Sequence, residues 1–199
     1  VRVFAQVTET AMREAIDRAK ANRDTLGGVV EVLAFGVPPG LGSHVHWDRR
    51  LDTQLAGALM SIQGIKAVEI GDGLGSAARP GSEAHDEIDY ADGHFVRAAD
   101  RAGGIEGGIS TGQTLRMRAA MKPISTLMRP LRSVDVATKE PAEAFRERSD
   151  VCAVPAAGVV AEQMVAYVLA REVLRKFGGD TVEDVLSAVE AYRTRLSSF

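Results

Sequence analysis

The sequence has only one cysteine, Cys152, among its 199 residues. A single cysteine cannot form an internal disulfide or a cysteine-based zinc cluster, and such sparing use is typical of a reducing compartment. No apolar run approaches the roughly 20 residues that a membrane-spanning helix needs, and no signal-peptide pattern is visible. We therefore expect a cytoplasmic protein that does not associate with membranes.

An excess of charge of one sign is also missing, because 24 Lys and Arg residues stand against 27 Asp and Glu, for a net charge of -3. This balance argues against a basic surface for nucleic acid. Aromatic residues are scarce at 5%, whereas glycine is abundant with 20 residues. The chain begins at Val1 and not at methionine, which leaves open that it is a piece of a longer protein.

Hydrophobic spacing predicts a compact unit of mixed helices and strands over residues 1–199, with no clear linker. Helical spacing predicts helices at residues 8–22, 48–62, 159–177 and 181–196, capped in the first, second and fourth cases by Thr8, Asp48 and a Thr181/Asp184 capping box. Strands are predicted at 29–35, mostly buried, at 65–70, and at 115–121 with one polar face. Residues 71–81, 82–100 and 150–158 are predicted to be loops.

A glycine cluster at residues 103–112 is the first candidate for ligand contact. Closely spaced glycines let backbone N–H groups approach an anion. The spacing matches neither the dinucleotide fingerprint nor a P-loop. A ligand-binding loop, including one for phosphate or a nucleotide, and a mobile turn both remain open.

Two polar segments are further candidates. Residues 122–126 follow a predicted strand and offer Lys122 and two hydroxyl groups to an anion. Arg148 and Asp150 stand beside an uncharged segment, where the arginine is suited to clamp an anion and a poorly solvated aspartate to move a proton. The alternative interpretation of Lys122 is a solvated lysine at a strand edge, and that of the segment with Arg148 and Asp150 is a surface ion pair.

His85 among carboxylates and the lone Cys152 are weaker candidates. The neighbouring Asp86 is expected to point away from His85 in an extended chain, which argues against a metal site or an acid–base pair. Cys152 has no histidine near it in the sequence, so a small buried side chain is favoured over a nucleophile.

Seven segments taken together, in this order, resemble the chorismate synthase family; they are residues 24–31, 37–43, 47–52, 81–87, 103–110, 121–126 and 148–155. The resemblance covers essentially the whole chain and looks like the actinobacterial branch. It reaches only the C-terminal part of the family's sequence. The histidine near the start, the arginine-rich substrate loop, the second histidine and the Arg-Ala-Ser flavin segment have no counterpart here.

The resemblance implies an FMN-dependent lyase of the shikimate pathway. Such an enzyme makes chorismate by 1,4-anti-elimination of phosphate from 5-enolpyruvylshikimate 3-phosphate, with reduced FMN as cofactor and no net redox change. It further implies an α+β fold, a sandwich of antiparallel sheets with helices between them, and a homotetramer. The reductant of the flavin would be NADPH or another protein.

The resemblance also assigns site residues. Those that match flavin contacts of the family are Gln63, Gly64, Gly107, Lys122, Pro123, Ile124, Ser125, Thr126 and Arg148. Asp150 matches the aspartate that helps to move the substrate-derived proton, and no metal ligand is implied.

The sequence departs from the family at four positions. Thr111 and Asp100 stand where asparagine is usual, Gly64 stands where alanine is usual, and His46 before Trp47 is an unusual residue that we expect to be a surface change. The first two change the hydrogen-bonding groups near the expected flavin site. We expect the chain alone to be incomplete for catalysis. The competing hypothesis is a scaffold or oligomerisation fragment that does not bind flavin.

Overall fold

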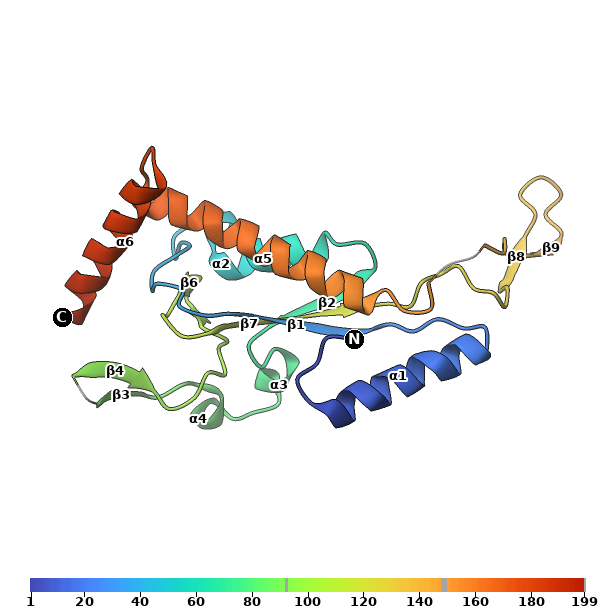
Figure 1. Cartoon of the computed structure of the whole chain (residues 1–199), viewed down its shortest axis with the longest axis horizontal. Helices are drawn as coiled ribbons and strands as arrows, with labels where there is room; N and C mark the ends of the chain where they lie inside the picture. Colours follow the sequence, from blue (N-terminus) through green and yellow to red (C-terminus); the bar gives the residue numbers. More distant parts are fainter. Residues whose placement is uncertain (92, 148–149, 199) are drawn as a thin grey trace.

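A computed structural model describes residues 1–91, 93–147 and 150–198 (Figure 1). Its centre is an antiparallel sheet in the order β1 (Gly28–Ala34), β7 (Leu115–Met121), β2 (Ile65–Ile70). The central strand pairs Ala119 with Val30 on one side and with Val68 on the other. All three strands were predicted from their apolar patterns, and their predictions are confirmed.

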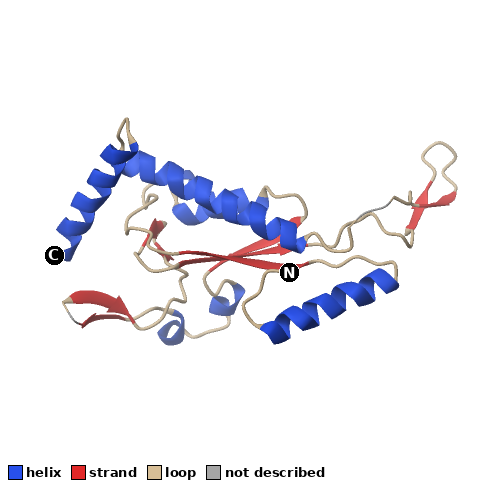
Figure 2. Ribbon diagram, viewed as in Figure 1, coloured by secondary structure: helices blue, strands red, loops and turns tan. Residues whose placement is uncertain are grey.

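Helices α2 (Leu51–Met60) and α5 (Val154–Phe177) cover one face of the sheet (Figure 2). The core between them and the sheet holds fully buried side chains, including Leu51, Leu55, Leu59, Met117 and Ala161. Both helices were predicted, with errors at their starts. Asp48 does not cap α2 but lies in a preceding 3-10 turn, η1 (Trp47–Arg49). Helix α5 begins five residues earlier than predicted, with Pro155 in its first turn.

The described residues leave the opposite face of the sheet largely uncovered. In β7, Leu115 and Met117 are buried and Arg116 lies on the other face, which confirms the predicted polar face. The prediction that the first strand is mostly buried is wrong, because Val29 remains 59% exposed and Leu33 37% exposed. Only one face of β1 has helices packed on it, so only alternate residues reach the core.

Helix α1 (Gln6–Ala21) lies on the side of the sheet away from α5 (Figure 1) and buries only Ala19. The expected cap at Thr8 is wrong. The helix begins two residues before Thr8, and its N-cap residue Ala5 makes no side-chain capping bond.

The loops predicted at residues 71–81 and 82–100 contain regular structure, so these two predictions are wrong in part. The segments are α3 (Leu74–Ala77), α4 (Gly81–Ala84) and the hairpin of β3 (Ile88–Ala91) with β4 (His94–Arg97). All four residues of β3 are exposed. The buried-face alternation that identifies a strand in a sequence is therefore missing.

The remaining elements are two hairpins and the last helix. They are β5 (Ile105–Glu106) with β6 (Ile109–Ser110), β8 (Arg132–Val134) with β9 (Pro141–Glu143), and α6 (Val182–Ser197). The capping box of Thr181 and Asp184 at the start of α6 is confirmed. The mixture of helices with antiparallel sheets confirms the α+β class. None of the helices in the described part of the chain is long and apolar enough to cross a membrane.

Candidate functional site

Two of the predicted flavin segments meet where β7 ends. The backbone N–H of Lys122 donates to the carbonyl oxygen of Gly64 at 2.9 Å, so residues 63–64 lie beside residues 122–126. The side chains of Gln63, Lys122 and Ser125 are exposed. A cation and a hydroxyl at an exposed strand end are suited to bind a phosphate or another anion.

The segment that carries Asp150 reaches the same place through the turn before β1. The Thr25 hydroxyl donates to the Ile124 carbonyl at 2.7 Å, and the Leu26 N–H donates to the Val151 carbonyl at 2.8 Å. We call Gln63, Gly64, residues 122–126 and Asp150 the strand-end cluster. The structure thus brings together three segments that are far apart in the sequence.

Asp150 does not have the environment expected for it. The sequence hypothesis calls for a poorly solvated carboxylate, whereas the Asp150 side chain is exposed in this chain. None of the residues that the structure describes shields the Asp150 side chain from water.

Gly107 lies away from the strand-end cluster. It forms the turn of the β5–β6 hairpin with Gly108, and φ is 58° at Gly107 and 87° at Gly108, as a two-residue type I′ turn requires. The Gly108 carbonyl accepts from the N–H of Leu51, the first residue of α2, at 2.8 Å. Since residues 63–64 follow the other end of α2, Gly107 is separated from the cluster by about 15 Å of helix. A Cβ built at Gly107 meets nothing within 4 Å, so a ligand can approach this turn.

The other predicted residues are placed as follows. Arg148 lies outside the described residues. His85 is exposed, while Asp86 is buried and accepts hydrogen bonds from the backbone N–H groups of Arg101 and Ala102, each at 3.0 Å. The prediction that His85 and Asp86 point apart is confirmed. Cys152 is half-buried and forms a β-bridge with Leu26, so it has a structural place.

Comparisons with known proteins show which family the chain belongs to. A family model described as chorismate synthase matches residues 1–174. The chorismate synthase of Kocuria rhizophila is 64% identical over 192 residues, which cover 96% of this chain and 46% of that protein. The chain belongs to the chorismate synthase family. The enzyme of Leifsonia xyli subsp. xyli is 60% identical over 197 residues, 99% of this chain and 49% of its own length.

A solved structure of a chorismate synthase agrees with this. It aligns to this chain with a TM-score of 0.80 and 43% sequence identity. The alignment covers 96% of this chain and 49% of the solved chain. The chain therefore spans about half the length of the family members that it matches.

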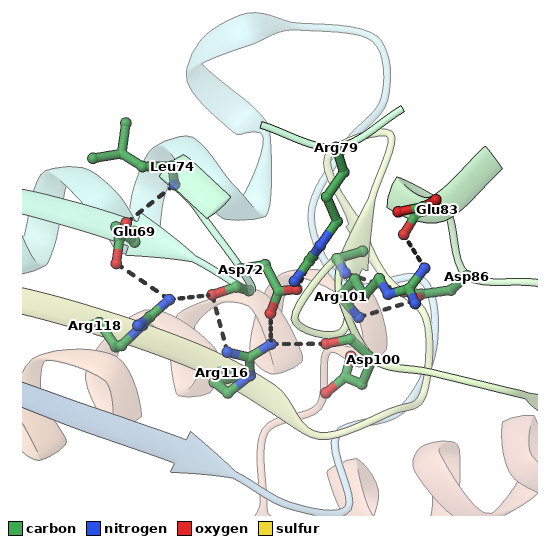
Figure 3. A network of polar contacts seen from close by, with 12 residues as sticks. Glu69, Asp72, Leu74, Arg79, Glu83, Asp86, Asp100, Arg101, Arg116 and Arg118 are labelled. Atoms are coloured by element: carbon green, nitrogen blue, oxygen red, sulfur yellow. Dashed lines mark hydrogen bonds and ion pairs between the residues drawn. The ribbon is translucent and has the colours of Figure 1, made fainter. Parts of the chain in front are cut away.

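A polar network, not predicted from the sequence, joins the loops beside the glycine cluster (Figure 3). Arg116 donates to the carbonyl oxygens of Gly71 and Asp100 and, at 2.6 Å, to the carboxylate of Asp72. Arg79 also pairs with Asp72. Hydrogen bonds from Arg116 and then Arg79 lower the pKa of Asp72 to about 2. The polar face predicted for β7 was the only sequence signal of this network.

Within the described part of the chain, Asp100, one of the departures from the family pattern, is one of two members of this network with a buried polar atom that lacks a partner, the other being Arg118 at its Nε. The Oδ1 atom of Asp100 is buried and has no hydrogen-bond partner among the described residues. Burial raises its pKa above the ordinary value, opposed by the N–H of Gly104 and the charge of Arg116. Because the pKa is higher in the folded than in the unfolded state, the stability that this group contributes is present at low pH. It is lost as the pH rises through the folded pKa.

The substitution Asp100→Asn is therefore expected to stabilise the protein that carries this chain. If removal of the buried, unpaired carboxylate charge stabilises the fold by about 1 kcal/mol, Tm at pH 7 should rise by roughly 1–2 °C in a protein about twice the length of this chain. The gain should shrink at acidic pH, where Asp100 is protonated. Thermal unfolding at both pH values measures it, with the exposed Asp17→Asn in α1 as the matched control. An unchanged or lower Tm at pH 7 contradicts the prediction.

Proposed function

We propose that the longer protein that carries this chain is a chorismate synthase. It would catalyse the 1,4-anti-elimination of phosphate from 5-enolpyruvylshikimate 3-phosphate, with reduced FMN as cofactor. The observation that carries the proposal is the strand-end cluster. It brings together Gln63, Gly64, residues 122–126 and Asp150, which the family resemblance assigns to flavin contact and proton transfer.

The residues of the cluster fit a flavin mononucleotide. The group carries a phosphate and is anionic in its reduced form, and the substrate carries a phosphate and carboxylates. The exposed Lys122 offers a mobile cation to these charges, and Ser125 offers a hydroxyl at the same edge. When bound, reduced FMN supplies transient electron density that helps the phosphate of the substrate to leave.

The chain's own residues then bind anions and move the proton. Lys122 stabilises negative charge on the flavin, the substrate or the departing phosphate. The carboxylate of Asp150 accepts the proton that leaves C6 of the substrate. This role needs water to be excluded around Asp150, and the remainder of the longer protein would provide the cover.

A stripe of apolar side chains on α5 is exposed in this chain, and the other half of the longer protein would cover it. Val160, Tyr167 and Leu174 stand seven residues apart on one face of the helix and are 46%, 64% and 56% exposed. The neighbouring face, with Ala161, is buried in the core. In the sandwich that the resemblance implies, a second sheet covers this stripe, so that α2 and α5 become central helices.

The finer properties of the enzyme are proposed on the resemblance alone. They are a cytoplasmic homotetramer whose flavin is reduced by NADPH or by another protein. The contrasting hypothesis is a scaffold or oligomerisation fragment, which the wide apolar exposure of α5 also fits.

An anaerobic assay tests the proposed function. The longer protein, given reduced FMN and 5-enolpyruvylshikimate 3-phosphate, is expected to release equal amounts of phosphate and chorismate, and none with FMN omitted. Absence of release with FMN present contradicts the proposal. A flavin titration separates the alternatives: the scaffold predicts no binding, and a general nucleotide module predicts binding of ADP as tight as that of FMN.

A further inference from the structure

We propose that Thr25 is a positioning residue of the candidate site. It fixes the position of the Lys122 segment relative to the Asp150 segment. The inference rests on the proposed function, because it takes these segments as the flavin and proton-transfer groups. Thr25 touches no reacting group itself. Its effect on the reaction would pass through the backbone of Ile124.

Thr25 and its neighbour are bonded to both segments at once. Thr25 is 8% exposed, and its hydroxyl donates to the Ile124 carbonyl at 2.7 Å. The next residue, Leu26, donates its N–H to the Val151 carbonyl at 2.8 Å and forms a parallel bridge with Cys152. Two consecutive residues thus tie one segment to the other.

The direct chain connection does not supply this link. The hairpin of β8 and β9 lies between residues 126 and 150 in the sequence and projects away from the sheet (Figure 1). Its strand residues are all exposed. The two segments therefore meet through the turn before β1, which crosses between them.

The fit of this turn against the lysine segment is tight. A Cβ atom at Gly27 would lie 2.3 Å from the carbonyl oxygen of Met121 and 2.9 Å from the nitrogen of Pro123. Only a residue without a side chain allows the two backbones to run so close together. With Gly28 paired to Met121, residues 25–28 follow residues 121–124 along their whole length.

The hydroxyl of Thr25 is the group on which this arrangement depends at the Ile124 end. If it is removed, the Ile124 carbonyl has lost a partner in a half-buried place and turns toward water or another donor. Lys122 and Ser125 on either side then move with the backbone. A side chain of the same shape without the hydroxyl should thus loosen the site and leave the turn filled.

The test uses the longer protein with three variants. Thr25→Val removes the hydroxyl and keeps the shape, Thr25→Ser keeps the hydroxyl, and Thr10→Val removes a similar hydroxyl bond, to the Gln6 carbonyl, on the exposed face of α1. The FMN dissociation constant, kcat and KM are measured at a temperature where the variant is fully folded, the first of them by fluorescence. Tm is measured separately by thermal unfolding.

Thr25→Val is expected to weaken FMN binding or lower kcat by about tenfold. Thr25→Ser should restore both to within about twofold, and Thr10→Val should change neither. A purely structural role would lower Tm and leave both constants of the folded enzyme unchanged, which overturns the inference. If Thr25→Val does not fold, Thr25→Cys replaces it, because a thiol is a weaker donor. Wild-type constants in that variant overturn the inference equally.

A parallel Lys122→Ala variant separates this inference from the proposed function. If that variant binds FMN as tightly as the wild type does, the assignment of the site fails. If it binds FMN weakly while Thr25→Val stays at wild-type affinity and kcat, the site assignment stands and only the role of Thr25 is overturned.

Discussion

Replacing Asp150 with asparagine is expected to lower kcat of the longer protein by about 100-fold or more and to leave FMN affinity within about threefold. The carboxylate is the proton acceptor in the proposed reaction, and an amide of the same size cannot take up the proton. Loss of a general acid or base typically lowers the rate by roughly 10²–10⁴-fold. Steady-state kinetics under anaerobic conditions, together with a flavin titration, measure both quantities.

Asp135→Asn is the matched control for Asp150→Asn. Asp135 lies in the β8–β9 turn, where its Oδ1 accepts from the N–H groups of Ala137 and Thr138. An asparagine oxygen can accept the same bonds, so kcat should not change. If Asp150→Asn keeps more than half of the wild-type kcat, Asp150 does not lie on the path of the proton.

Replacing Lys122 with alanine has the second largest expected effect, and it falls on binding. A charge-assisted hydrogen bond contributes about 1.5–3 kcal/mol. Its loss should raise the dissociation constant for FMN or the substrate by roughly 10- to 100-fold. The affinity of the wild type should also fall with added salt more steeply than that of the variant, because one ionic contact is missing.

Lys139→Asn is the control for Lys122→Ala. It removes a lysine from the β8–β9 turn, where φ is 64°, a conformation that asparagine tolerates. Its affinities should equal those of the wild type. Equal affinities for Lys122→Ala would remove Lys122 from the site.

The sequence was most informative where burial repeats at the period of an element. The strands around Val30, Val68 and Met117 have apolar residues toward the helices, and all were predicted. The hairpin with Tyr90 and Phe95 was missed because both rings are exposed. They meet edge to face, with centroids 5.2 Å apart, and no buried face marks the strands in the sequence. The early start of α5 was signalled by Pro155, which is favoured in a first helical turn.

Prediction of the candidate site was limited by long-range contacts. Residues 122–126 and Asp150 were candidates from their residue types, whereas Gln63 and Gly64 came from the family pattern alone. Neither source indicates which contacts hold these residues together. The hydrogen bond from Thr25 to Ile124 joins residues 99 positions apart. The hydrogen bonds that Asp86 accepts from Arg101 and Ala102 span 15 and 16 positions. Such contacts leave no periodic signal. The exposure of Asp150 likewise depends on which surfaces this chain leaves uncovered.

A comparison of this 199-residue chain with the longer protein tests most directly whether the chain supplies only half of the site. Each is incubated anaerobically with reduced FMN and 5-enolpyruvylshikimate 3-phosphate, and phosphate release is followed, with circular dichroism to verify helix content. We expect no turnover by the chain alone, and turnover by the longer protein or by the chain after addition of the missing part. Robust turnover by the chain alone would contradict the claim that it supplies only half of the site.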